Sequence, residues 1–337
     1  MIVSPALLER TLFCVILNLP KLTLVHVREN ATAERPRFYD RRLPENSFGQ
    51  RHRKAASLRW TTSAACPIAL GKINLHAVAY LFDHAWEQER ERLAGIEGLQ
   101  DPFTTDILKR LGVQPGWHCL EIGGGGGSIA AWLCDRVGPS GKVVATDLET
   151  KFLSRIATTN LEVRSHDLRK DEFEPGAYDL VHSRKVLEHL PEPFALLEKI
   201  SKSVRPGGWL FVEDVDHASF LKVTARDPVF FERAFKAYVR AMQEAGFQPF
   251  IGRELAGWLR QLGFEQVDCE GRIHEWTAHG SQPIAVFYRL MWRRLRDRVL
   301  ELKLLSEKEA DQFLTDVEDP NFRAIGSISF GAWGRKP

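Results

Sequence analysis

One stretch of the chain constrains its fold more than any other. Residues 118–122 form an apolar, strand-like segment that contains Glu121 and runs directly into five glycines at 123–127. A helix-like segment, 128–137, is followed by a second apolar strand that ends in Asp147. Glycines lack a Cβ, so the backbone can approach a ligand closely and adopt positive φ angles. This order predicts a βαβ unit that binds a ligand at the carboxyl ends of its strands.

The spacing of the glycines separates two classes of nucleotide-binding protein. The dinucleotide-binding pattern G-x-G-x-x-G/A, started at Gly123, requires Gly or Ala where Ser128 stands. A dehydrogenase is therefore a distant alternative. The pattern E-x-G-x-G-x-G fits four residues without a gap: Glu121, Gly123, Gly125 and Gly127.

This second pattern resembles motif I of the class I S-adenosylmethionine-dependent methyltransferases. Further segments of the chain resemble later motifs of that family: 166–168, 178–190 and 204–214. Within the family, the chain looks like the bacterial small-molecule enzymes of quinone and natural-product biosynthesis. The resemblance implies an α/β fold with a Rossmann-like, doubly wound, seven-stranded and mostly parallel sheet. It also implies an antiparallel last strand and a helical substrate cap.

The resemblance implies S-adenosyl-L-methionine as the cofactor. By resemblance, Asp147 accepts both ribose hydroxyls and Glu121 lies near the methionine end. Asp167 then receives the adenine amino group, with a helix cap as its alternative role, and the backbone N–H of Leu168 meets the ring. The complete set expected at the cofactor is Tyr80, Glu121, Gly123, Gly125, Gly127, Asp147, Leu148, Asp167, Leu168, Ser183 and Arg184.

Catalytic residues are less determined, because methyl transfer needs a general base only when the nucleophile arrives protonated. His217 follows the fifth predicted strand, and His189 lies near the expected mouth of the site. Both are candidate bases, since imidazole titrates at roughly pH 6.5. His182, at the end of the fourth predicted strand, is a weaker candidate. A structural role is the alternative for each histidine.

Composition restricts the classes of partner and substrate that the chain is expected to bind. The net charge of +2 over 337 residues argues against a general nucleic-acid partner. Five scattered cysteines without metal spacing argue against a metal site and favour a reducing compartment, so we expect a cytoplasmic protein. No apolar run is long enough to predict a membrane span. Aromatic residues are frequent after residue 214, which favours a flat, apolar or aromatic small-molecule substrate. The oligomeric state is left open.

The predicted organisation has four parts. The first is a basic, poorly ordered extension at 1–70. The second is a methyltransferase core at 71–275, with its cofactor-binding part at 100–214 and a cap helix at 227–246. A helical cap insertion at 276–323 and a last strand at 324–337 follow. The extension is basic because 28–59 carries nine Lys or Arg residues against four Asp or Glu residues. Separate helices are predicted over 74–95 and 104–111, and the final strand over 324–333.

The leading hypothesis is methyl transfer to an O, N or C nucleophile of a small molecule. One alternative is an RNA or protein methyltransferase that uses the basic extension. Another is a cofactor-binding protein without turnover, because fold resemblance does not define a reaction.

Overall fold

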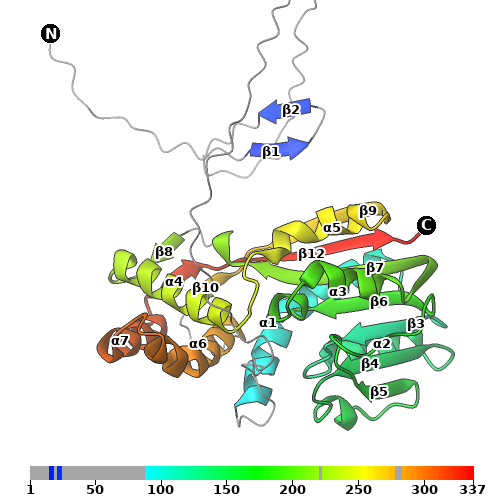
Figure 1. The fold of residues 1–337 in the computed structure, drawn as a ribbon, viewed down its shortest axis with the longest axis horizontal. Helices are drawn as coiled ribbons and strands as arrows, with labels where there is room; N and C mark the ends of the chain where they lie inside the picture. The colour runs from blue at the N-terminus through cyan, green and yellow to red at the C-terminus, as the bar shows by residue number, and fades with distance from the viewer. Residues whose placement is uncertain (1–14, 19–20, 25–87, 220–221, 278–282) are drawn as a thin grey trace, which may run out of the picture. The chain divides into compact units, whose positions relative to one another are not determined.

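The computed structural model describes five segments of the chain: 15–18, 21–24, 88–219, 222–277 and 283–337. The chain divides into two units, 1–69 and 70–337. In the first unit, β1 (Val15–Asn18) pairs with β2 (Lys21–Leu24) in antiparallel fashion. The second unit contains the elements that form the candidate site (Figure 1).

A seven-stranded sheet forms the centre of the second unit. In spatial order its strands are β5 (Leu161–Ser165), β4 (Lys142–Asp147), β3 (His118–Ile122), β6 (Tyr178–Arg184), β7 (Val204–Asp216), β12 (Ile328–Arg335) and β9 (Glu265–Arg272). The first five pair in parallel, whereas β12 is antiparallel to both β7 and β9. The order reverses at β3, and ligands bind where such a reversal opens a crevice at the carboxyl edge. The predicted doubly wound sheet with an antiparallel last strand is confirmed.

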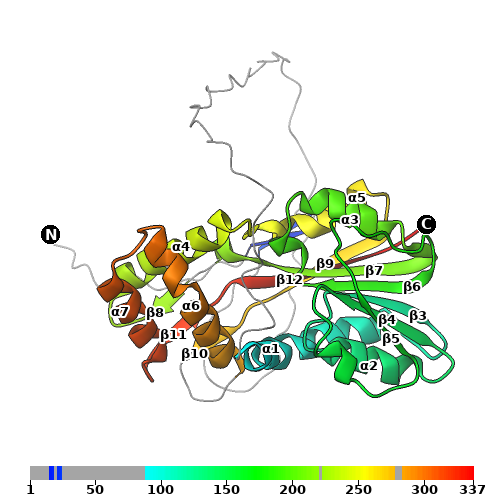
Figure 2. The ribbon, with the colours of Figure 1, turned by 60° about the horizontal axis from the view of Figure 1, so that its bottom comes forward.

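Helices cover both faces of this sheet (Figure 2). Helices α1 (Glu89–Arg110) and α2 (Ser128–Val137) pack on one face. Helices α3 (Pro193–Ser201) and α5 (Leu255–Gln261) pack on the other. Successive side chains of a strand point to opposite faces, so the adjacent buried residues Val143 and Val144 belong to the two different cores.

Helix α1 corrects one prediction. The two separate helices expected over 74–95 and 104–111 are, in the described part, one helix that runs through Pro102. Proline removes the backbone hydrogen bond to residue i−4. The helix nevertheless continues because its apolar face, including Phe103 and Ile107, is buried against the sheet. Residues 74–87 of the first predicted helix lie outside the described residues.

A second group of elements lies beside the carboxyl edge of the sheet. It contains a three-stranded antiparallel sheet of β10 (Glu275–Thr277), β11 (Arg323–Ile325) and β8 (Lys222–Thr224), with helices α4 (Pro228–Glu244), α6 (Pro283–Glu301) and α7 (Glu307–Glu318). The single strand predicted over 324–333 is therefore wrong. The chain leaves one sheet after Ile325, where the N–H of Gly326 donates a last bond to the carbonyl of His274 at 3.0 Å, and it enters the other sheet at Ile328.

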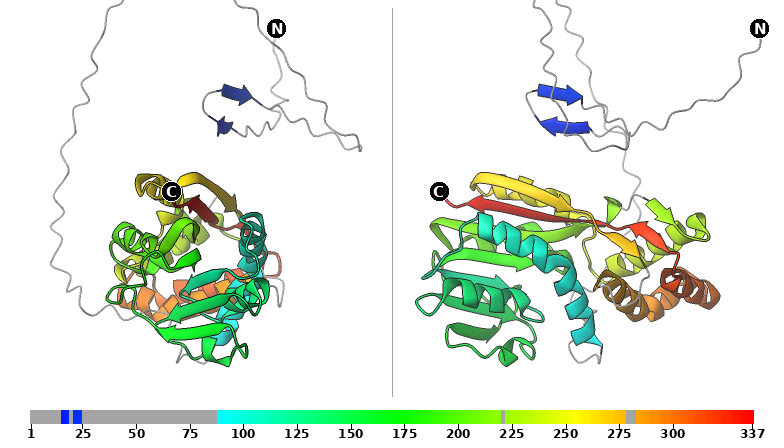
Figure 3. Two further views of the ribbon diagram at one scale, coloured as in Figure 1. Left: turned by 90° about the vertical axis from the view of Figure 1, so that its right-hand side faces the viewer. Right: turned by 180° about the vertical axis from the view of Figure 1, so that it is seen from behind.

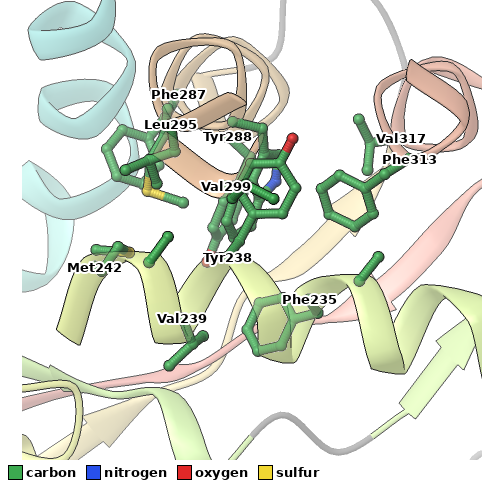
Figure 4. Packing of buried hydrophobic residues seen from close by; sticks show 14 of the residues in the cluster. Phe235, Tyr238, Val239, Met242, Phe287, Tyr288, Leu295, Val299, Phe313 and Val317 are labelled. Atoms are coloured by element: carbon green, nitrogen blue, oxygen red, sulfur yellow. The ribbon is translucent and has the colours of Figure 1, made fainter. Parts of the chain in front are cut away.

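Aromatic side chains form the core of this second group, which we call the cap. The ring of Trp292 is fully buried, with centroids 5.7 Å from Phe235, 4.8 Å from Tyr238 and 5.4 Å from Phe313. Figure 4 shows Tyr238 from α4, Tyr288 from α6 and Phe313 from α7 in this cluster. Most of the aromatic residues noted in the sequence thus pack against one another. Four short 3₁₀ turns complete the described unit: η1 (Leu153–Arg155), η2 (Leu187–His189), η3 (His217–Ser219) and η4 (Ile251–Glu254).

Helix α1 joins the cap to the sheet. Figure 3 shows this helix, in cyan, crossing from the sheet towards α6. The helices approach closely at Gly95, where an added Cβ would lie 2.9 Å from the carbonyl oxygen of Pro283. Of the helices in the described segments, none combines the length and the apolar character that a membrane span requires.

Candidate active site

A pocket follows the carboxyl ends of β3, β4, β6 and β7. Its first part is lined by the glycine turn, Glu121, Asp147 and Asp167. Its second part is lined by η2, by the end of β7 and by cap residues. The pocket therefore lies where the sheet topology predicts a ligand.

The glycine turn is closed to side chains. Gly123 has a φ of +67°, and a Cβ there would lie 2.2 Å from Cγ2 of Val186. A Cβ at Gly126 would lie 2.0 Å from Oε1 of Glu97, which reaches over the turn from α1. No side chain of the turn therefore lies between its backbone and the pocket. Of the three glycines predicted to bind the cofactor, Gly123 and Gly125 line the pocket, whereas Gly127 is the N-cap residue of α2 and is not among the lining residues.

Asp147 meets the glycine turn at the end of β4. Its Oδ2 accepts the N–H of Gly125 at 2.9 Å, and its Oδ1 accepts the N–H of Glu149 at 3.2 Å. A carboxylate oxygen has two lone pairs, so each oxygen can accept a second hydrogen bond. The carboxylate is thus fixed by the backbone and still able to bind two further donors. Leu148 also lines the pocket, with 42% of its surface exposed.

The turn after β5 contributes Asp167 and Leu168, both in the pocket lining. Arg169 donates to Asp167 through its backbone N–H, Nε and Nη2 at 3.1, 2.8 and 2.9 Å. The side-chain bond from Arg169 holds the pKa of Asp167 well below its usual range. His166 also lines the pocket, which the sequence prediction missed. Its ring stacks on Phe173 at a centroid distance of 4.0 Å, and its buried Nε2 has no partner among the described residues.

Three neighbouring strands place a histidine between two carboxylates. Nδ1 of His182 lies 2.6 Å from Oε2 of Glu121, and its Nε2 lies 3.1 Å from Oε1 of Glu213. Burial alone would lower the pKa of His182, but the charges and hydrogen bonds of Glu121 and Glu213 outweigh it and raise the pKa to about 9. His182 is fully buried. Because both ring nitrogens are engaged, the hypothesis that this histidine is a general base is not supported.

Ser183 and Arg184, the predicted cofactor residues at the end of β6, differ in position. Arg184 lines the pocket and donates to Oγ1 of Thr104 and to Oδ1 of Asp101, both at 2.9 Å. Ser183 is buried, is not among the lining residues, and its Oγ has no partner in the described part of the chain. Tyr80 lies outside the described residues.

His189 and His217 both line the second part of the pocket. Burial lowers the pKa of each to about 4, although the charge of Glu188 acts in the opposite direction. Nδ1 of His217 lies 2.7 Å from Oγ of Ser327, and Nε2 of His189 lies 3.5 Å from Oε1 of Glu188. Both imidazoles are therefore neutral near pH 7 and able to accept a proton or a hydrogen bond.

Two buried carboxyl groups accompany these histidines, and the sequence prediction assigned no role to either. Burial raises the pKa of Glu188, but the positive charge of Lys185 and a hydrogen bond from the backbone N–H of Val215 help to bring it below its usual value. Burial and the charge of Glu188 raise the pKa of Asp214 well above its usual value. Lys185 has a φ of +55°, which non-glycine residues rarely adopt and which is typical of functional sites.

The cap supplies an apolar wall with a few polar atoms. Lining residues from the cap and from the chain leading to it include Met242, Phe247, Phe287, Tyr288 and Met291. Two further lining atoms, Oε1 of Gln100 and Nε2 of His274, are buried and have no partner among the described residues. Because buried polar atoms are normally paired, these atoms are available to a ligand.

The fold and the site together define a nucleotide-binding α/β protein with a second, apolar compartment. A family model described as "Methyltransferase domain" matches residues 81–268, more than half of the chain. The chain belongs to this methyltransferase family, and the resemblance stated from its motifs is confirmed.

Two relatives and one solved structure show the range of similarity. "Methyltransferase str3" of Strobilurus tenacellus is 32% identical over 141 residues, 42% of this chain and 50% of that protein, so the chain spans about half the length of this relative. "Ubiquinone biosynthesis O-methyltransferase" of Xanthomonas campestris pv. campestris is 28% identical over 188 residues, 52% of this chain and 74% of that protein. The structure of Haemonchus contortus phosphoethanolamine N-methyltransferase 2 in complex with S-adenosyl-L-methionine matches with a TM-score of 0.45 at 19% identity, over 70% of this chain and 53% of that chain.

Proposed function

We propose that this chain is an S-adenosyl-L-methionine-dependent methyltransferase that methylates an O, N or C nucleophile of a small molecule. One observation carries the proposal: the N–H of Gly125 donates to Oδ2 of Asp147 at 2.9 Å, and both residues line a pocket whose lining also includes Glu121 and His217. Membership of the methyltransferase family supports it. When bound, the cofactor supplies a methyl group already activated on a sulfonium, so the protein has mainly to position the nucleophile and exclude water.

The residues of the pocket fit this cofactor. Each oxygen of Asp147 has a lone pair for one ribose hydroxyl. Asp167, Leu168 and the unpartnered Nε2 of His166 border the place of the adenine ring. Oε1 of Glu97 and Oε1 of Gln100 are buried acceptors without a partner in the described part of the chain, and we assign them to the amino group at the methionine end.

The second part of the pocket favours an apolar or aromatic substrate. Its wall combines the aromatic rings of Phe247 and Phe287 with the flexible side chains of Met242 and Met291. Pockets of this composition bind flat, apolar molecules and use a few polar groups to orient them. The name of the Xanthomonas relative, a ubiquinone biosynthesis O-methyltransferase, supports a small molecule as substrate rather than a polymer.

We assign His217 as the general base that accepts a proton from the nucleophile of the substrate. It is neutral because burial lowers its pKa to about 4, and Ser327 fixes its ring. A neutral imidazole can accept the proton of an O–H or N–H nucleophile, and the carboxylate of Glu188 would stabilise the resulting imidazolium. His189, whose Nε2 lies 3.5 Å from Oε1 of Glu188, is the alternative.

Calorimetric titration with S-adenosyl-L-methionine, with NADH as the control ligand, tests the cofactor. We expect binding of the first ligand alone. Asp147→Ala should weaken binding by about 1.5–3 kcal/mol because the ribose hydroxyls lose a charged acceptor. Asp135→Ala, an exposed position on α2, is the matched control and should bind normally. Absence of binding by the unmodified chain would refute the proposal.

A screen of phenolic, quinone and indole acceptors then tests the reaction. With an accepted substrate, His217→Gln should lower the rate by about a hundredfold, the lower end of the usual range for a general base. Losses of only a few-fold in both His217→Gln and His189→Gln would show that positioning alone accounts for the catalysis.

The basic segment that supports an RNA or protein substrate lies outside the described residues. We also keep the cytoplasm as a proposal, supported by the scattered cysteines, of which Cys119, Cys134 and Cys269 are free thiols.

A further inference from the structure

The His182 site is unusual because a cation and two carboxylates are buried together inside the sheet. Glu121 from β3, His182 from β6 and Glu213 from β7 lie on adjacent strands, and the ring is fully buried. Both carboxyl groups are also almost fully buried, at 3% and 2% exposed. Isolated charges are costly in such a place, so each must be paired.

The positions of the hydrogens follow from the acceptors. Ionised carboxylates only accept hydrogen bonds, so the contacts of the ring nitrogens with Glu121 and Glu213 at 2.6 and 3.1 Å fit a ring that carries a proton on each nitrogen. An imidazole with a proton on both nitrogens is a cation. The neighbouring charged groups are Glu121 and Glu213, and, one contact further, Arg184 of β6 and Asp101 of α1. The ring of Phe211, 4.9 Å away, covers His182 without adding a charge.

This cluster continues into the cofactor part of the pocket at two points. Glu121 itself lines the pocket; its bond to His182 uses Oε2, and Oε1 accepts no hydrogen bond from the described residues. Glu213 accepts the hydroxyl of Thr104 at 3.1 Å, and Arg184 donates to the same hydroxyl at 2.9 Å.

Helix α1 and the glycine turn meet at the far end of the same chain of contacts. Arg184 also binds Asp101, which accepts the hydroxyl of Ser128 at 3.0 Å, at the first residue after the glycine turn. Helix α1 contributes Glu97 and Gln100 to the pocket as well. The sheet, the glycine turn and α1 are therefore joined by one continuous set of hydrogen bonds.

We infer that His182 is a positioning residue for the cofactor, a buried imidazolium that orients the carboxylate of Glu121 with Oε1 directed to the ligand and ties the glycine turn to α1. The inference rests on the proposed function, because it assigns the cofactor as that ligand. Without the cation, one of the two carboxylates would lose its donor and its fixed orientation.

Nuclear magnetic resonance of the unmodified chain tests the charge state without any ligand. We expect the ¹⁵N shifts of His182 at about pH 7.5 to show protons on both ring nitrogens, since its pKa is raised to about 9. A neutral ring at that pH would overturn the inference. This measurement reports the charge state of His182 whether or not the proposed function is correct.

Cofactor titration of His182→Gln tests the positioning role. We expect the affinity of the folded protein for S-adenosyl-L-methionine to fall about ten- to a hundredfold, the value of one charge-assisted hydrogen bond. The unmodified chain should also lose affinity as the pH rises through about 9, and the variant should not show this loss. His118→Gln, in the same sheet but at the amino end of β3 and outside the pocket, is the matched control.

The outcomes are separable. If His182→Gln is less stable but its folded fraction binds as tightly as the unmodified chain, the positioning role is overturned and the proposed function stands. If the unmodified chain does not bind S-adenosyl-L-methionine, the proposed function is refuted and the positioning role with it. If His182→Gln does not fold, Thr104→Val is titrated instead; it removes the link between Glu213 and Arg184 without changing a charge, and an unchanged affinity would overturn the role.

Discussion

Two buried groups of histidines and carboxyl groups border the same pocket in opposite charge states. In the sheet, the pKa of His182 is raised to about 9. Beside the cap, the pKa values of His189 and His217 are lowered to about 4. Burial is the largest single influence on all three and lowers each pKa, so burial alone does not determine the charge.

The difference lies in what each ring contacts. His182 has a carboxylate oxygen at both nitrogens, at 2.6 and 3.1 Å. His217 has a hydroxyl group at Nδ1, and the carboxylate of Glu188 lies 3.5 Å from Nε2 of His189. Two short contacts with carboxylates overcome desolvation at His182, whereas the longer contact with Glu188 does not do so at His189. The charged group thus supports the cofactor end, and the neutral groups face the place that we assign to the substrate.

The largest expected effect comes from breaking the charged group. Glu213→Gln leaves the His182 imidazolium with one carboxylate instead of two, and removing one partner of a buried ion pair costs about 3–5 kcal/mol of unfolding free energy. Urea denaturation at pH 7 measures it. Glu162→Gln removes a carboxylate from solvent-accessible ion pairs with Lys142 and Arg164 and should cost about 1 kcal/mol. Equal losses in the two variants would contradict a charged His182.

The pH dependence of stability should have opposite signs in the two groups. His189 and His217 are neutral in the folded state above about pH 4 but protonate at roughly 6.5 when unfolded. Their contribution is therefore present above roughly pH 6.5 and is lost as the pH falls towards 4, at about 1.4 kcal/mol per pH unit for each histidine. The contribution of His182 is complete below roughly pH 6.5 and is lost as the pH rises through about 9.

Denaturation between about pH 5 and 9 measures how the free energy of unfolding depends on pH. His217→Gln replaces one titrating group, so it should reduce the slope on the acid side by the contribution of one histidine. His182→Gln should reduce the slope on the alkaline side. A free energy of unfolding that stays constant from pH 6.5 down to 5 would contradict the neutral state of His189 and His217.

The two groups were predictable from the sequence to different degrees. The glycine turn, Glu121 and Asp147 lie within one continuous motif, so the fold and the centre of the cofactor part could be predicted. His182 and Glu213 could be found as polar residues in apolar strands, but their pairing depends on β6 lying between β3 and β7. A periodic pattern of apolar residues predicts the strands but not the side-chain contacts between them.

The cap side was less predictable because its contacts are formed between distant segments. His217 was identified as a candidate, but its partner Ser327 is 110 residues away. Ser327 lies in the pocket lining at the passage from β11 to β12, between two different sheets, and no local pattern indicates that passage. The continuation of α1 through Pro102 likewise depends on burial against the sheet, since local propensity argues for a break.

A smaller effect is expected from the neutral group. Ser327→Ala removes the hydroxyl at Nδ1 of His217 and leaves a buried ring nitrogen without that partner, at a cost of about 1–2 kcal/mol of unfolding free energy. Because the ring also loses its orientation, we expect kcat to fall more than KM rises. Ser154→Ala removes an exposed hydroxyl on η1 and should change stability by less than about 0.5 kcal/mol. An unchanged kcat in Ser327→Ala would show that Ser327 does not orient His217.

The smallest effect should occur one residue away from the largest. Glu213 and Asp214 are consecutive and both buried, yet burial and the charge of Glu188 raise the pKa of Asp214 well above its usual value. The raised pKa favours the protonated carboxyl group of Asp214, and Asp214→Asn replaces that neutral form by a neutral amide of nearly the same shape. Asparagine can still accept the N–H of Glu188 through its side-chain oxygen, so we expect a change within about 1 kcal/mol of unfolding free energy. Comparing Asp214→Asn with Glu213→Gln in one denaturation series separates charge from burial, because the two positions differ in their partners and not in their exposure. A loss in Asp214→Asn as large as that in Glu213→Gln would mean that Asp214 is ionised, and that Glu188 does not set its charge.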